Sequence, residues 1–292
     1  MRQAPRLRQD AETLAGPFPP LLAAAEHLAS SVMAGEHGRR RVGQGDQFWQ
    51  YRPSHAGDEA RSIDWRRSAR SDDGWFVREK EWQAAQSVMI WLDTGQSMEF
   101  SSDKALSTKA DRARVLSLAM AVLLIRGGER VGLTNAGLPP RSGQVQLMRL
   151  TASLSESAAA AEYIAPELRG VPARSRAVFV SDFLGDIGPV TTALTRAADR
   201  GVDGALVQVL DPQEEAFPFD GRTIFESVGG TLAHETLKAG DLRGRYLERL
   251  AERKDQLQSL CRATGWQFHC HHTDASASAA LLWLFGALER VH

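Results

Sequence analysis

The sequence predicts an α/β fold in which helices cover both faces of a mainly parallel sheet. Strand-type apolar runs alternate with segments of helical periodicity, the pattern of β-α-β crossovers. Two of these runs, 88–92 and 176–181, suit strands buried on both faces, and each ends in an aspartate, Asp93 or Asp182. This Rossmann-like arrangement places both aspartates at the carboxyl edge of the sheet, where ligands bind in such folds.

The remaining elements follow from periodicity and from turn residues. Before the first core strand we expect a loose arm at 1–17, a short amphipathic helix at 21–33 and an extended edge strand at 75–82. After it we expect a helix at 109–125, a strand at 129–134, a turn at Pro139-Pro140, an edge strand or helix start at 145–148, a helix at 190–200, a strand at 204–210, an irregular segment at 217–231, a helix at 242–264, a strand at 266–271 and a helix at 277–288.

Composition limits the classes of function. The chain has 292 residues, enough for one large domain or a domain with an extension. Its net charge of -1 argues against a globally basic nucleic-acid binder. The two cysteines, Cys261 and Cys270, provide no disulfide framework, and no apolar run reaches the roughly 18 residues of a membrane span. These features predict a cytoplasmic protein without a membrane-spanning segment.

A segment at 57–70 has no strand or helix period, so loop geometry and side-chain contacts must explain it. Its glycine, acids, arginines, serine and tryptophan follow the pattern Gly57, Asp58, Arg61, Asp64, Trp65, Arg66, Ser68 and Arg70. Together with the Asp93 loop, this block resembles a bacterial family known as domain of unknown function 58. Its members look like von Willebrand factor A-type domains with an added upstream segment, and they are associated with MoxR-type AAA+ ATPases. The resemblance implies an extension at 18–85 and a von Willebrand factor A-like domain at 86–292.

The resemblance also implies a metal-ion-dependent adhesion site for a divalent cation, which we expect to be Mg²⁺. Asp93 and Ser97 match the first and last positions of its Asp-x-Ser-x-Ser loop, whereas Gly95 stands in place of the first serine. Asp182 corresponds to the distant aspartate, and Ser142 is the candidate for the intermediate threonine. Carboxylate and hydroxyl oxygens are the ligands that Mg²⁺ prefers. The glycine removes one direct ligand, so the predicted site is degenerate.

These features predict a non-enzymatic protein-interaction or adaptor module whose partner is a MoxR-type ATPase or a substrate of that ATPase. One alternative is a metal-dependent hydrolase using Asp58, Asp64, Asp93 and Asp182. A second is nucleic-acid or other anion binding through the arginine-rich extension. The second is disfavoured because acids lie among the arginines and can pair with them.

The histidines and cysteine at 269–272 suggest zinc. On a strand, however, His269 and His271 face away from Cys270, so adjacent positions alone do not converge on an ion. The sequence offers no second Cys/His pair nearby, and we therefore expect strand histidines without a metal role.

Overall fold

The computed structural model describes residues 19–35, 48–55, 63–70, 74–80, 85–155, 161–226 and 233–289. The chain divides into two compact units. The smaller unit comprises residues 39–85, and the larger comprises residues 1–38 together with 86–292.

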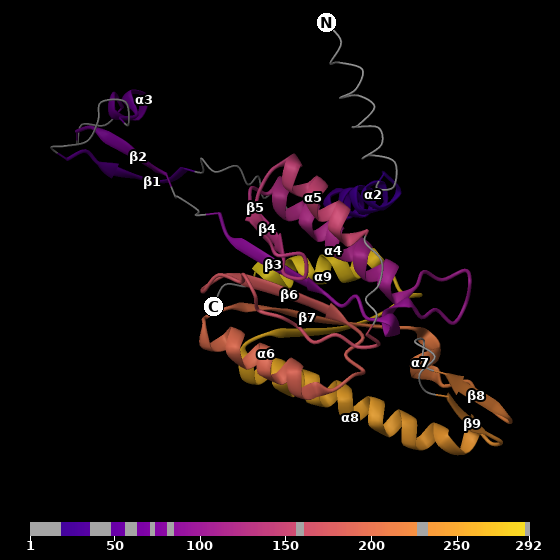
Figure 1. The fold of residues 1–292 in the computed structure, drawn as a ribbon. Coiled ribbons are helices and arrows are strands. Elements are labelled where there is room, and N and C mark those ends of the chain that lie inside the picture. The colour runs from indigo at the N-terminus through magenta and orange to yellow at the C-terminus, as the bar shows by residue number, and fades with distance from the viewer. Residues whose placement is uncertain are drawn as a thin grey trace, which may run out of the picture. The chain divides into compact units, whose positions relative to one another are not determined.

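The larger unit is built on a six-stranded sheet with the order β10-β7-β6-β3-β4-β5. All neighbouring strands are parallel except β5, which runs antiparallel to β4 (Figure 1). The strands are β3 (Ser87–Leu92), β4 (Arg130–Leu133), β5 (Leu138–Arg141), β6 (Arg176–Ser181), β7 (Asp203–Leu210) and β10 (Gln267–His272). The predicted α/β fold with a mainly parallel, helix-flanked sheet is confirmed.

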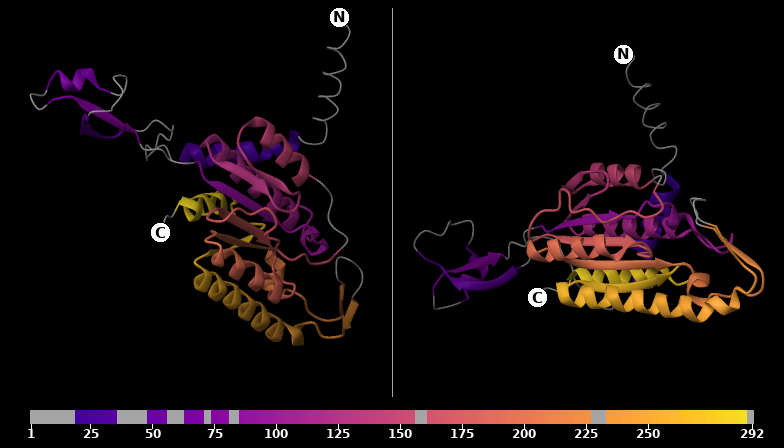
Figure 2. Two further views of the ribbon diagram at one scale, coloured as in Figure 1. Left: turned by 60° about the vertical axis from the view of Figure 1, so that its left-hand side comes forward. Right: turned by 60° about the horizontal axis from the view of Figure 1, so that its bottom comes forward.

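Helices cover both faces of this sheet (Figure 2). One face packs against α2 (Pro19–Gly35), α4 (Lys109–Arg126), α5 (Gln144–Leu154) and α9 (Ala277–Glu289). The other packs against α6 (Ile187–Asp199) and α8 (Gly240–Thr264). Strand β3 shows why both faces are apolar: Val88, Ile90 and Leu92 belong to the first core, and Met89 and Trp91 to the second.

Helix α2 packs on α4 and α9 within the first core. The family resemblance implies that this helix belongs to the extension at 18–85. Its small and apolar residues Ala25, Leu28, Ala29 and Val32 are buried, so the packing of α2 belongs to the larger unit.

Two segments differ from their predicted form. Pro139 and Pro140 were expected to form a turn, but they lie in β5 at the edge of the sheet. An edge strand tolerates proline because one row of its backbone groups has no strand to pair with. The sequence predicts an edge strand or a helix start at 145–148, and these residues lie in α5.

The predicted irregular segment at 217–231 contains regular structure. Strand β8 (Thr223–Glu226) pairs antiparallel with β9 (Ala233–Thr236), and the short helix α7 (Pro212–Ala216) precedes them. The sequence reading missed α7 because its five residues are too few to show an apolar period. No helix within the described ranges is long and apolar enough to span a membrane.

In the smaller unit, β1 (Phe48–Pro53) pairs antiparallel with β2 (Phe76–Lys80), and α3 (Trp65–Ser68) lies between them in sequence. Strand β2 falls within the predicted strand at 75–82. It pairs with β1 in a two-stranded sheet of its own.

Candidate functional site at the carboxyl edge of the sheet

Asp93 follows β3 directly, and its carboxylate connects the ends of two adjacent strands. Its Oδ2 accepts a hydrogen bond from Ser181 Oγ at the end of β6, at 2.6 Å. Its Oδ1 accepts from the backbone N–H of Gly95, at 2.7 Å. The side chain is only 3% exposed, so both oxygens are satisfied inside the protein.

Burial raises the pKa of Asp93 to about 6. The hydrogen bonds from Ser181 and Gly95 oppose this rise, and the nearby charge of Asp182 adds to it. The carboxyl group therefore titrates near neutral pH, in the range where acid–base groups are used at functional sites.

Asp182, the first residue after β6, pairs with a buried lysine. Lys109 Nζ lies 2.9 Å from Asp182 Oδ2 and 2.6 Å from Glu214 Oε1. Lys109 is 1% exposed and Asp182 is fully buried. Burial acts to lower the pKa of Lys109, but Asp182 and Glu214 outweigh burial and raise it. This ammonium therefore stays charged and neutralises the carboxylates around it.

The loop after β3 explains the glycine at position 95. A Cβ atom on Gly95 would lie 2.5 Å from the carbonyl oxygen of Glu162 and 2.9 Å from Asp93 Oδ1. A serine would not fit there unless the loop moved. Ser97 lies on the same loop; its hydroxyl is buried, and no atom of the described residues bonds to it.

A cavity of about 120 Å³ opens where β3 and β6 end and α6 begins. Its wall combines two buried carboxylates with apolar and aromatic side chains. The lining residues are Asp93, Tyr163, Ile164, Ala165, Ser181, Asp182, Phe183, Gly185, Asp186, Pro189 and Val190.

One wall of the cavity is held in a strained conformation. Phe183 has φ 51°, which is uncommon for a residue with a side chain. Arg253 Nη1 donates to the carbonyl oxygen of Phe183, at 2.8 Å, and to that of Gly185. The Phe183 ring packs near Trp91, with ring centroids 6.3 Å apart. Surroundings that hold such a conformation are common at binding sites.

The structure brings some of the predicted site residues together and separates others. Asp93 and Asp182 line the same cavity, and Gly95 and Ser97 lie on the loop that follows Asp93. Ser142 is not part of this group, which corrects the sequence assignment. Strand β5 runs antiparallel, so Ser142 follows Arg141 beside Val131, near the start of β4 and at the opposite edge of the sheet.

The donor set does not fit a Mg²⁺ ion of the adhesion-site type. Such an ion requires near-octahedral oxygen ligands. Here both oxygens of Asp93 are already bonded, and Asp182 binds the Lys109 ammonium. Gly95 offers no hydroxyl group and no space for one. Only the unbonded Ser97 hydroxyl would favour a ligand.

Three residues of this site were missed by the sequence reading: Ser181, Lys109 and Glu214. Lys109 carried a signal that could have revealed it. A lysine in the first turn of a helix is unfavourable for the helix dipole, which indicates that an acidic partner lies beside it. Glu214 belongs to the unpredicted helix α7, where its side chain also completes a capping box with Asp211.

The described part of the 57–70 block performs local structural roles. Asp64 caps α3 by accepting from the backbone N–H groups of Arg66 and Arg67, each at 3.1 Å. Ser68 Oγ donates to the Asp64 carbonyl and accepts from the N–H of Phe76.

The exposed side of this block carries an aromatic pair and two arginines. Trp65 packs edge-to-face on Trp75, with ring centroids 5.8 Å apart. Arg66 and Arg70 are exposed. The predicted motif residues Gly57, Asp58 and Arg61 lie outside the described residues.

Comparison with known proteins identifies the family. Residues 50–256 match the family described as "Protein of unknown function DUF58". The chain belongs to the DUF58 family. The resemblance drawn from the 57–70 block and the Asp93 loop is thereby confirmed at the level of the family.

The chain is also similar to two mycobacterial proteins. Uncharacterized protein Rv1480 of Mycobacterium tuberculosis and Uncharacterized protein Mb1516 of Mycobacterium bovis are each 25% identical over 248 residues. The match covers 80% of this chain and 77% of each relative.

Two solved structures show weaker similarity. The conserved hypothetical protein BatB from Bacteroides thetaiotaomicron is 15% identical, with a TM-score of 0.38 over 69% of this chain and 98% of BatB. An aerotolerance-related membrane protein from Bacteroides fragilis is 14% identical, with a TM-score of 0.39 over 71% of this chain and 100% of that chain. The predicted cytoplasmic location is corrected here: a protein described as a membrane protein is among the matches, and this contradicts that prediction.

Proposed function

We propose that the larger unit of this DUF58 protein is a non-enzymatic protein-interaction module. In this proposal, a side chain of a partner protein enters the cavity beside Asp93. The cavity of about 120 Å³ supports this because it has the room of roughly four water molecules, which is comparable to one side chain. Apolar walls with a few fixed polar groups are typical of binding sites.

The charge of the cavity decides which partner group fits. The Lys109 ammonium is already paired with Asp182 and Glu214, whereas Asp93 has no basic partner among its described bonds. A lysine, an arginine or another hydrogen-bond donor of the partner would be attracted to Asp93. An acidic side chain of the partner could bind only through a cation at this site. Without a cation, Asp93 would repel it.

The partner that we propose is a MoxR-type AAA+ ATPase or a substrate of that ATPase. The family resemblance supplies this candidate, and the cavity supplies the chemistry of the contact. A divalent cation at Asp93 stays a prediction of the sequence reading. The proposed contact does not require one.

A metal-dependent hydrolase is the second candidate, and the geometry favours it less. Neither histidine nor cysteine is present among the described residues that line the cavity. The raised pKa of Lys109 keeps the lysine protonated, so it cannot serve as a general base. Asp64 is accounted for as a helix cap, and Asp58 lies outside the described residues.

Anion or nucleic-acid binding is the third candidate and concerns the smaller unit. Arg66 and Arg70 are exposed there, whereas the guanidinium of Arg67 lies over the Phe76 ring, 5.4 Å from its centroid. Titration of a labelled duplex at low and moderate salt tests this candidate, because phosphate contacts make affinity strongly salt-dependent.

The test of the proposed function is a binding titration between the full chain and the purified ATPase of the same organism. Asp93→Asn keeps the shape of the side chain and removes its charge. The matched control is Asp203→Asn, because Asp203 is exposed at the start of β7, at the other edge of the sheet.

We expect Asp93→Asn to weaken binding by more than about 10-fold, since it removes a charge-assisted hydrogen bond. Asp203→Asn and the addition of EDTA should leave the affinity unchanged. Equal affinities for the wild-type chain and Asp93→Asn would refute the role of the cavity. Loss of binding in EDTA would instead support the cation.

A further inference from the structure

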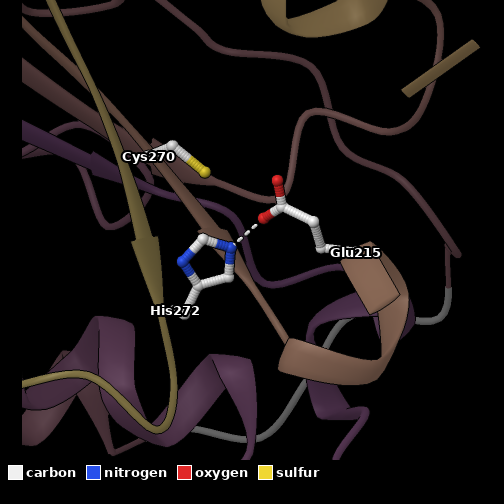
Figure 3. Close-up of side chains that lie close together, drawn as sticks. All are labelled: Glu215, Cys270 and His272. Atoms are coloured by element: carbon white, nitrogen blue, oxygen red, sulfur yellow. Dashed lines mark hydrogen bonds and ion pairs between the residues drawn. The ribbon is translucent and has the colours of Figure 1, made fainter. Parts of the chain in front are cut away.

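A second cluster of reactive side chains lies at the same edge of the sheet, at the ends of β7 and β10. Cys270 and His272 are two residues apart on β10, so their side chains lie on the same face. Glu215 of α7 faces both of them (Figure 3). One nitrogen, one sulfur and one oxygen atom of these three residues lie within 4.8 Å of one another.

The backbone fixes this convergence. Strands β7 and β10 are parallel neighbours, and His272 stands opposite Leu210, the last residue of β7. Helix α7 begins two residues later, and its capping box at Asp211 sets its direction. Glu215 is thereby held beside the end of β10, where His272 Nε2 contacts Glu215 Oε2.

The other histidines of the strand are engaged elsewhere. His269 stacks on Trp283 of α9, with ring centroids 4.6 Å apart. His271 Nε2 lies 3.4 Å from Arg112 Nη1. The sequence reading correctly separated these two from Cys270. It missed that His272 shares the face of Cys270 and that α7 supplies a third ligand.

The donor set is that of a borderline-soft divalent ion. Zn²⁺ is bound by cysteine sulfur, histidine nitrogen and carboxylate oxygen, with bond lengths of about 2.0–2.3 Å. Tetrahedral geometry then separates the ligand atoms by roughly 3.3–3.8 Å. The three donor atoms lie within 4.8 Å of one another, so small side-chain movements would bring them to the tetrahedral spacing. Three protein ligands leave a fourth position for water or another group.

Lys254 of α8 orients Glu215, one of the three side chains. Its Nζ lies 2.5 Å from Glu215 Oε1, which leaves Oε2 directed toward His272. Hydrogen bonds that orient a ligating group in this way are usual at metal sites.

An ordinary ion pair between Glu215, Lys254 and His272 is the alternative explanation. It accounts for the carboxylate and the imidazole, but it gives the thiol of Cys270 no role. Sulfur, nitrogen and oxygen ligands that converge from two separate elements are accounted for together by a metal ion.

We propose that Glu215, Cys270 and His272 form a three-ligand site for Zn²⁺ or a similar borderline-soft divalent ion. Binding would fix α7 against the end of β10. Because the adjacent Glu214 binds Lys109, the ion would also steady the Lys109–Asp182 pair beside the Asp93 cavity.

The proposal is tested with the purified full chain, stripped of metal by a chelator and titrated with Zn²⁺ against a chromophoric competitor. We expect one ion per chain. Cys270→Ser and His272→Gln should each weaken binding by more than about 100-fold, and Lys254→Met by about 10-fold. His269→Asn is the matched control on the other face of β10, and it should bind as the wild-type chain does.

Loading with Co²⁺ gives a second readout. A thiolate-to-cobalt charge-transfer absorption should appear in the wild-type chain and in His269→Asn, and it should be missing in Cys270→Ser. Circular dichroism confirms that each variant is folded. The proposal is overturned if the folded wild-type chain takes up no stoichiometric metal, or if Cys270→Ser and His272→Gln both bind as tightly as the wild-type chain.

Discussion

Replacing Lys109 by methionine tests the buried ion cluster beside the cavity. The substitution keeps the length and much of the volume of the side chain and removes its charge. It leaves Asp182, which is fully buried, and Glu214 without their shared cation. Removing one member of a buried ion pair costs about 3–5 kcal/mol, because the remaining charge stays desolvated. We expect a loss of this size in the free energy of unfolding at pH 7.

The pH dependence of this loss follows from the sign of the pKa changes. In the wild-type chain, the raised pKa of Lys109 means that its stabilising contribution is fully present below its unfolded pKa and is lost only at strongly alkaline pH. In Lys109→Met, Asp182 and Glu214 lose their shared cation, so ionising these two carboxyls inside the protein opposes folding as the pH rises above about 4. The deficit should therefore shrink toward acid pH.

The assay is denaturant unfolding at 25 °C, with Arg114→Met as the matched control on the same helix. Arg114 pairs with Glu99 and Asp111 near the surface, and Asp111 is more than half exposed. Such pairs contribute about 0–1 kcal/mol. The double variant Lys109→Met with Asp182→Asn should recover part of the loss. A loss below about 1 kcal/mol for Lys109→Met, equal to that of the control, would refute the reasoning.

Two further predictions concern the loop after β3. Because burial raises the pKa of Asp93 from 3.8 to about 6, its ionisation opposes folding, and the penalty grows as the pH rises from about 4 to above 6. Between pH 4 and pH 7.5, the wild-type chain should therefore lose about 2 kcal/mol in its free energy of unfolding relative to Asp93→Asn. Parallel stability profiles of the two proteins would contradict the burial of the charge. Gly95→Ser should lower the free energy of unfolding by about 1–3 kcal/mol, because the new side chain would contact the Glu162 carbonyl. Addition of Mg²⁺ should not restore the stability of this variant. A Mg²⁺-dependent rise in its melting temperature would contradict this, because it would show that the site lacked only a hydroxyl ligand.

The sequence was sufficient to predict the core of the fold and the two aspartates of the site. Buried strands such as β3 and β6 are continuous apolar runs, and the rule that parallel strands share a carboxyl edge placed Asp93 and Asp182 together. Ser142 could not be placed in this way. Its position depends on the antiparallel course of β5, and the two prolines of that strand were read as a turn.

The sequence also did not predict which side chains pair with one another. The pairing of Lys109 with Asp182 joins residues 73 positions apart, and no local period encodes such a contact. The cluster at Cys270 and His272 needed Glu215 from a five-residue helix that periodicity cannot detect. Glu214 and Glu215 both belong to α7, so the missing helix explains why these two carboxylates were not predicted.

The central claim is that a partner protein occupies the cavity beside Asp93. A photoreactive phenylalanine derivative in place of Tyr163, which lines the cavity and is 45% exposed, would report this contact directly in the native cell. The control position is Val145 on α5, which is 68% exposed. We predict a crosslink from position 163 that Asp93→Asn abolishes, and none from position 145. The same crosslinked partner from both positions, or a crosslink from position 163 that persists in Asp93→Asn, would contradict the account.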